Sequence, residues 1–170
     1  FLDAHTFNEP LNNWDVSKVT NMHAMFDNAY VFNQPLNNWD VSKVTNMSEM
    51  FSSAETLAFN QPLDNWDVIK VTDMSYMFKD AISFNQPLNN WDVSNVTDMS
   101  CMFYKATSFN QPLNNWDVSS VIDMKGMFGG AEAFNQPIEN WDVSNVIDMT
   151  SMFRAGIFNQ PIGNWDVSNV

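Results

Sequence analysis

The tripeptide Trp-Asp-Val recurs seven times in this 170-residue chain, and four of the six spacings between consecutive copies are 25 residues. The exceptions are a spacing of 27 between Trp39 and Trp66 and one of 24 between Trp141 and Trp165. Both length changes fall just before Phe-Asn-Gln-Pro, which indicates a loop at that place. A fixed period of about 20 to 50 residues is typical of stacked repeats. We therefore expect one repeat domain, residues 1–170, of about seven coils.

The repeat also accounts for the composition. All 7 Pro, 7 Trp, 12 Met and 14 Phe fall on repeat positions, so no apolar residues remain for a second core. Units that each expose an apolar face bury it by stacking on one another. The chain begins and ends inside a unit, so we expect an internal fragment of a longer array. It contains no run of about 20 apolar residues, which predicts no direct membrane insertion by this segment.

The first half of each unit has the spacing of a short strand. In Leu36–Val41, Trp39 and Val41 alternate with Asn38 and Asp40, and a period of two indicates a strand with one buried face. Pro35 suits the start of such a strand. The tryptophans are the expected structural core: Trp14, Trp39, Trp66, Trp91, Trp116, Trp141 and Trp165.

The second half of each unit predicts a short helix or 3₁₀ turn. In Val44–Ala54 the apolar residues follow steps of three, three, one and three, which form one stripe of a helix. Asn46, or Asp73 in the next unit, is the expected N-cap, and Ser48 or Ser75 is the competing choice. A strand, a turn, a short helix and a loop close one circuit of a solenoid, in which like strands pair in parallel. The expected fold class is an α/β solenoid.

The repeat also resembles a known family. Leu-x-x-Trp-x-Val resembles the strand of leucine-rich repeats, and the unit from Phe-Asn-Gln-Pro to Met-Phe is similar to the bacterial surface protein repeat of about 26 residues, grouped with BspA-like leucine-rich repeats. The resemblance covers residues 1–170. It implies a right-handed stack of leucine-rich-repeat type on a secreted or cell-surface protein, a role in adhesion, and no enzymatic activity.

The candidate binding residues are the polar residues expected on the exposed strand face. Short polar side chains in such turns commonly accept backbone hydrogen bonds, which gives each Asp a structural role. Calcium between coils is an alternative, because Ca²⁺ takes six to eight oxygen ligands; a basic or sugar-rich partner is another. The candidate residues are Asn38, Asp40, Ser42, Asn65, Asp67, Asn90, Asp92, Ser94, Asn115, Asp117, Ser119, Asn140, Asp142 and Ser144.

The Asn of Phe-Asn-Gln-Pro recurs in every unit, from Asn8 to Asn159. We expect these residues to form a buried ladder that bridges loop backbones, which is a role in stability. The single cysteine, Cys101, cannot form an internal disulfide and is expected to be a partly exposed substitution.

Charge and the regularity of the units restrict the function. A net charge of −13 predicts no nucleic-acid partner. Catalysis needs residues in differentiated environments, and no group of residues breaks the period, so we predict no enzyme and no cofactor other than the calcium alternative. We expect an extracellular or cell-surface recognition module that binds a protein or glycan. The alternative is a structural spacer or assembly subunit.

Overall fold

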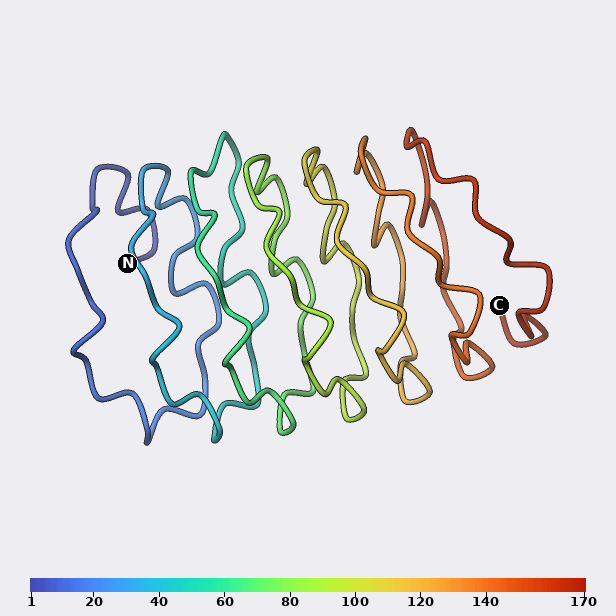
Figure 1. The fold of residues 1–170 in the computed structure, drawn as a ribbon, viewed down its shortest axis with the longest axis horizontal. Coiled ribbons are helices and arrows are strands. Elements are labelled where there is room, and N and C mark those ends of the chain that lie inside the picture. Colours follow the sequence, from blue (N-terminus) through green and yellow to red (C-terminus); the bar gives the residue numbers. More distant parts are fainter.

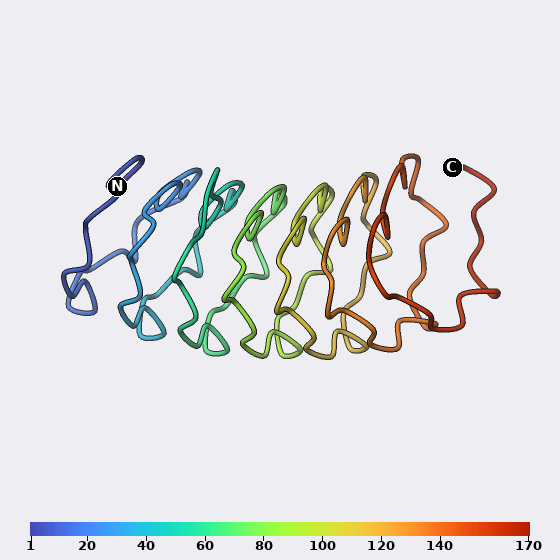
Figure 2. The same cartoon turned by 90° about the horizontal axis from the view of Figure 1, so that it is seen from above.

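The computed structural model describes residues 1–170 as a row of coils, each of which contains one repeat. Equivalent segments of successive coils lie side by side along the long axis, and the two chain ends lie at opposite ends of the row (Figure 1). The row follows a shallow arc when it is seen from above (Figure 2). The chain contains turns, bends and isolated bridges, but no α-helix, 3₁₀-helix or extended strand.

The predicted strand at Leu36–Val41 is wrong. The Trp39 N–H donates to the Leu36 carbonyl at 3.0 Å and the Val44 N–H to the Val41 carbonyl at 2.9 Å, so a tight turn lies on each side of Trp-Asp-Val. No backbone hydrogen bond joins this segment to a neighbouring coil. The alternation of side chains is nevertheless present, since Trp39 and Val41 are buried while Asp40 is exposed.

The predicted helix or 3₁₀ turn at Val44–Ala54 is also wrong, and the equivalent segment of the next coil shows why. The N–H groups of Met74, Tyr76, Phe78 and Asp80 donate to carbonyls of the following coil at 2.8–3.0 Å. In an α-helix the same groups would bond within the segment. Tyr76 and Asp80 also have φ of 58° and 55°, and this left-handed conformation interrupts a right-handed helix.

The remaining amides of this segment close tight turns. The N–H groups of Met77, Lys79 and Ala81 each donate to the carbonyl three residues earlier, at 3.0–3.2 Å. Every second amide therefore bonds inside the coil and the others bond to the next coil, which satisfies the backbone without a helix. Successive coils share one parallel bridge each, along the column Asn21, Asn46, Asp73, Asp98, Asp123 and Asp148. The expected α/β solenoid, a right-handed stack with a strand and a helix in each coil, is therefore not the fold.

The core is one continuous cluster of 47 buried hydrophobic residues that runs through the coils. Two columns of phenylalanine rings fill its centre. In the column of Met-Phe residues, Phe78 and Phe103 have ring centroids 5.6 Å apart; in the column of Phe-Asn-Gln-Pro residues, Phe84 and Phe109 are 6.1 Å apart. Within one coil Phe78 and Phe84 stack at 4.1 Å, so each ring contacts rings in its own coil and in both neighbours.

The tryptophans form a third column beside the phenylalanines. Trp39, Trp66, Trp91, Trp116 and Trp141 are buried, whereas Trp14 near one end of the row is 50% exposed and Trp165 near the other end is half-buried. Trp66 and Trp91 stack with centroids 6.4 Å apart. The Trp91 Nε1–H donates to the Leu63 carbonyl of the preceding coil at 2.9 Å, and the same bond recurs from Trp39 to Trp165. Each indole therefore holds two coils together.

Candidate functional site: the Asn-Asp-Ser face

The Asn-Asp-Ser face consists of the candidate residues that flank each buried Trp-x-Val pair. Because Trp91 and Val93 are directed into the core, Asn90 and Asp92 are exposed and Ser94 is half-buried. The other predicted residues of this face lie in the same way: Asn38, Asp40, Ser42, Asn65, Asp67, Asn115, Asp117, Ser119, Asn140, Asp142 and Ser144 are all exposed or half-buried. The stack of coils brings them together in columns.

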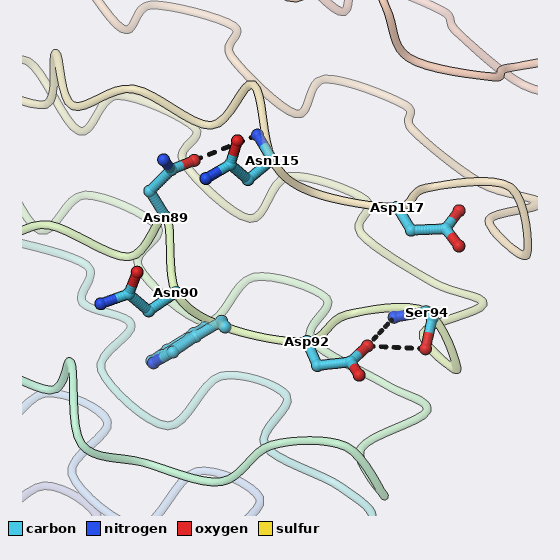
Figure 3. Close-up of a pocket in the computed structure, with 7 residues that line it drawn as sticks. Asn89, Asn90, Asp92, Ser94, Asn115 and Asp117 are labelled. Carbon is cyan, nitrogen blue, oxygen red and sulfur yellow. Dashed lines mark hydrogen bonds between the residues drawn. The ribbon is translucent and has the colours of Figure 1, made fainter.

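Each Asp of this face except Asp67 is fixed by the Ser two residues later. Asp92 Oδ1 accepts the Ser94 N–H at 3.1 Å and the Ser94 hydroxyl at 2.6 Å (Figure 3). Short polar side chains often close a turn in this way. The Ser hydroxyl, then the Ser amide, hold the pKa of Asp40, Asp117 and Asp142 below the usual value. These carboxylates are therefore ionised at neutral pH.

The other oxygen of each carboxylate has no hydrogen-bond donor within the protein. For Asp40, Asp92 and Asp117, every hydrogen bond of the side chain uses Oδ1. Since these residues are exposed, Oδ2 is free to accept a bond from outside. The face thus presents a row of fixed anionic acceptors, one in each coil.

A polar hollow of about 410 Å³ lies between the coils of Asp92 and Asp117. The Asn115 N–H donates to Asn89 Oδ1 at 3.1 Å, which fixes its upper rim (Figure 3). Trp91 is the only apolar residue among the seven that line it. Asn89 was not among the predicted site residues, although the Asn-Asn pair before Trp14, Trp39, Trp91 and Trp116 is a visible signal for a second amide column.

The Asn ladder of Phe-Asn-Gln-Pro is confirmed, although its members are half-buried or exposed and not fully buried. Asn85 Oδ1 accepts the Asn110 N–H at 3.0 Å and the Gln111 Nε2–H at 3.0 Å. Equivalent bonds run from Asn8 to Asn159. These side chains replace backbone pairing in a segment that has none.

Period-breaking residues change the face locally. Ile69 replaces the Ser after Trp66-Asp67-Val68, so Asp67 keeps only the backbone bond, from the Ile69 N–H at 3.2 Å. No group of three or more His, Cys, Asp or Glu side chains is arranged to hold a metal ion. Cys101 is half-buried, and burial is the main cause that raises the pKa of its thiol. The structure has no helix long and apolar enough to cross a membrane.

Comparison with known protein families gives a match along the whole chain. The family described as "Mycoplasma protein of unknown function, DUF285" matches residues 1–100, 34–133 and 85–170. The chain belongs to the DUF285 family. The three overlapping matches reflect the DUF285 repeat, whose 25-residue units are nearly alike. No curated protein and no solved structure matches the chain.

The DUF285 match corrects the expected family. Nothing in the comparisons indicates a BspA-like leucine-rich repeat, so that resemblance was wrong. The Leu-x-x-Trp-x-Val spacing resembles a leucine-rich repeat because both patterns direct alternate residues inward. In this chain, however, the segment is bounded by two turns and lacks the parallel ladder of such a strand.

Proposed function

We propose that this DUF285 chain is a non-enzymatic recognition or adhesion module, at the cell surface or outside the cell, that binds a protein or glycan partner through the Asn-Asp-Ser face. The supporting observation is the row of carboxylates held by Oδ1, as in Asp92, with Oδ2 exposed and unbonded. A carboxylate that is already oriented loses little conformational entropy on binding. Sugar hydroxyls and Lys or Arg side chains are the donors that suit such acceptors.

The uniformity of the row argues for binding and against catalysis. Asp40, Asp117 and Asp142 each bond to the Ser two residues later, and the pKa of each is shifted in the same direction. None is therefore distinguished as an acid or a base. General acid and base catalysis requires groups whose environments drive their pKa values apart. A row of equal sites suits a partner with repeated donors.

A structural spacer or assembly subunit is the second candidate. The bonds that join coils are almost the same throughout, and the Trp Nε1 bond to the preceding coil recurs six times. A chain that serves only to separate other parts needs this regularity and no partner on its exposed face.

The test is binding to immobilised arrays of oligosaccharides and of Lys- and Arg-rich peptides, with the chain and a double variant, Asp92→Asn with Asp117→Asn. Asn keeps the turn, because Asn46 Oδ1 accepts the Ser48 N–H and hydroxyl at 2.9 and 2.7 Å. The matched control is Asp98→Asn, in a column that already contains Asn21 and Asn46. We expect the double variant to bind at least about tenfold more weakly, since hydrogen bonds to charged groups contribute about 1.5–3 kcal/mol each.

The control should bind like the parent chain. If no array member binds, or if the double variant and the control are weakened equally, the Asn-Asp-Ser face is not the site and the spacer candidate is favoured.

A further inference from the structure

The two-residue insertion between Trp39 and Trp66 alters the loop edge of one coil. In four other coils the Ala that follows Met-Phe-x-x is buried: Ala29, Ala81, Ala106 and Ala131. In the longer coil Ala54 is exposed, and Leu57 is 1% exposed and belongs to the core cluster. Leu57 is thus the buried residue of this segment, whereas residues 54–56 project from the edge as an exposed loop.

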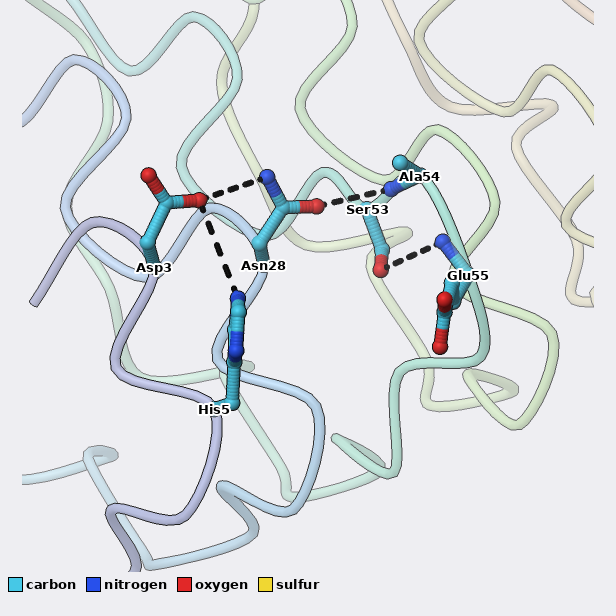
Figure 4. A network of polar contacts seen from close by, with 6 residues as sticks. All are labelled: Asp3, His5, Asn28, Ser53, Ala54 and Glu55. Carbon is cyan, nitrogen blue, oxygen red and sulfur yellow. Dashed lines mark hydrogen bonds and ion pairs between the residues drawn. The ribbon is translucent and has the colours of Figure 1, made fainter.

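Hydrogen bonds hold this loop in place. The Ala58 N–H donates to the Tyr30 carbonyl at 2.9 Å, and the Ala54 N–H donates to Asn28 Oδ1 at 2.8 Å. Asn28 Nδ2 in turn donates to Asp3 Oδ1 at 3.0 Å, and the Glu55 N–H donates to Ser53 Oγ at 3.1 Å (Figure 4). The projecting loop is therefore part of a polar network that crosses three coils, so its shape is defined before any partner arrives.

A hollow of about 430 Å³ lies beside the projecting loop; we name it the insertion hollow. Five of its seven lining residues are hydrophobic, including Tyr30, Val31, Leu57, Ala58 and Ile82. Val31 is 45% exposed. The two positions that Tyr30 and Val31 occupy hold Thr107 and Ser108 in a regular coil. Apolar side chains are therefore gathered where the period breaks, and the volume is within the range of about 300–1,000 Å³ typical of ligand sites.

The surroundings of the insertion hollow are negatively charged. Burial raises the pKa of the Tyr30 hydroxyl, and the negative charges of Glu55, Asp3 and Asp27 raise it further. The nearby cations are engaged elsewhere, since Lys79 Nζ lies 3.4 Å and Lys105 Nζ 4.0 Å from the carboxylate of Asp80. An anionic lipid or nucleic acid would be repelled from this place.

We infer that the insertion hollow is a docking site for a segment of a partner protein that presents one apolar side chain flanked by lysine or arginine. The apolar lining would bury the central side chain, and Glu55 and Asp3 would attract the flanking cations. A glycan fits this hollow less well, because few polar groups line it. The site lies on the loop edge and uses none of the Asn-Asp-Ser face, so it is independent of the proposed function.

The test uses the full chain and three fluorescein-labelled pentapeptides in a fluorescence anisotropy titration. The peptides are Lys-Lys-Phe-Lys-Lys, Lys-Lys-Ala-Lys-Lys and Glu-Glu-Phe-Glu-Glu. We expect the first to bind at least about tenfold more tightly than Lys-Lys-Ala-Lys-Lys, since a buried aromatic ring contributes well over a factor of ten. It should also bind more tightly than Glu-Glu-Phe-Glu-Glu, whose negative charges the acidic surroundings repel. Equal binding of the first two peptides would mean attraction by net charge alone and would overturn the inference.

Variants locate the site. Val31→Ser with Ile82→Thr introduces residues that the repeat already uses at these positions, Ser108 and Thr107, and should weaken Lys-Lys-Phe-Lys-Lys by about tenfold. Glu55→Gln should weaken it by about two- to fivefold. The matched control, Ile122→Thr, removes an Ile that is 45% exposed on another part of the coil, in a column that contains Thr97, and should change nothing.

Two further results would overturn the inference. One is a loss of affinity in Ile122→Thr equal to that in the Val31 and Ile82 variant. The other is a loss of affinity for Lys-Lys-Phe-Lys-Lys in the Asp92→Asn, Asp117→Asn variant, without any loss in the Val31→Ser, Ile82→Thr variant or in Glu55→Gln. That result would place the peptide on the Asn-Asp-Ser face.

Discussion

Replacing Trp91 by Ala should destabilise the chain strongly, because this indole is central to the core. Trp91 is 2% exposed, stacks on Trp66 with centroids 6.4 Å apart and donates Nε1–H to the Leu63 carbonyl at 2.9 Å. Removing a buried aromatic ring costs about 3–5 kcal/mol through lost contacts and the cavity that remains. Loss of the indole hydrogen bond adds about 1 kcal/mol, although the Leu63 carbonyl still accepts the Trp66 N–H at 3.1 Å. We expect a total loss of about 4–6 kcal/mol in the free energy of unfolding.

Urea unfolding followed by circular dichroism would measure this loss, with two matched variants beside it. Trp91→Phe keeps a ring and removes only the hydrogen bond and part of the volume, so it should cost about 1–3 kcal/mol. Trp14→Ala removes an indole that is 50% exposed and makes no Nε1 hydrogen bond, so it should cost less than half as much as Trp91→Ala. Equal losses for Trp91→Ala and Trp14→Ala would refute the reasoning, because burial would then not determine the contribution of a tryptophan.

Two further predictions concern the polar columns. Asn85→Ala should cost about 1–3 kcal/mol in urea unfolding, because the Asn110 N–H and the Gln111 amide lose their acceptor, whereas Asn85→Asp keeps an acceptor and should cost less. Ser42→Ala should raise the pKa of Asp40 in an NMR titration, since the Ser42 hydroxyl is the main cause that lowers it. A lowered folded-state pKa stabilises the fold above the unfolded value of 3.8, so the stability difference between Ser42→Ala and the parent should disappear as the pH falls below 3.8. An unchanged pKa of Asp40 would contradict this account.

The sequence predicted which side chains face the core better than it predicted the backbone. Trp39 and Val41 are buried and Asp40 is exposed, as a period of two requires. The same alternation arises in a strand and in a short extended piece between two turns, so spacing alone does not distinguish them. The bond from Ser42 to Asp40 follows from residue chemistry, because Asp two residues before Ser commonly closes a turn.

The helix prediction failed because a stripe of Met and Phe indicates which side chains are buried. It does not indicate which carbonyls accept the backbone N–H groups. The residue before the second Met of each Met-x-x-Met is left-handed in all six coils that contain this motif, yet only Gly126 among these six residues is a glycine, so the usual signal was missing. One signal was present: Asp73-Met-Ser75 repeats the Asp-x-Ser pattern, and the Ser75 N–H donates to Asp73 Oδ1 at 2.9 Å. Asp73, the expected N-cap, thus closes a turn of the same kind as the one formed by Asp40 and Ser42.

The insertion hollow could not be predicted from the pattern. The extra residues near Glu55 were visible as a loop, but whether Leu57 or Ala54 would occupy the core depends on packing against Phe51 and Phe59. The larger apolar side chain took the buried place, which the hydrophobic effect favours.

The ring spacings have a geometrical consequence for the array. Equivalent centroids are 5.6 Å apart in the Met-Phe column, 6.1 Å in the Phe-Asn-Gln-Pro column and 6.4 Å in the tryptophan column. Because each coil is thicker on one side than on the other, the coils fan out like wedges, in keeping with the shallow arc in Figure 2. A straight polymer that lies along such a curved row can contact equivalent positions in only a few consecutive coils. The wedge shape of each coil would therefore set the curvature of the row, and the number of repeats would set its total bend and its reach.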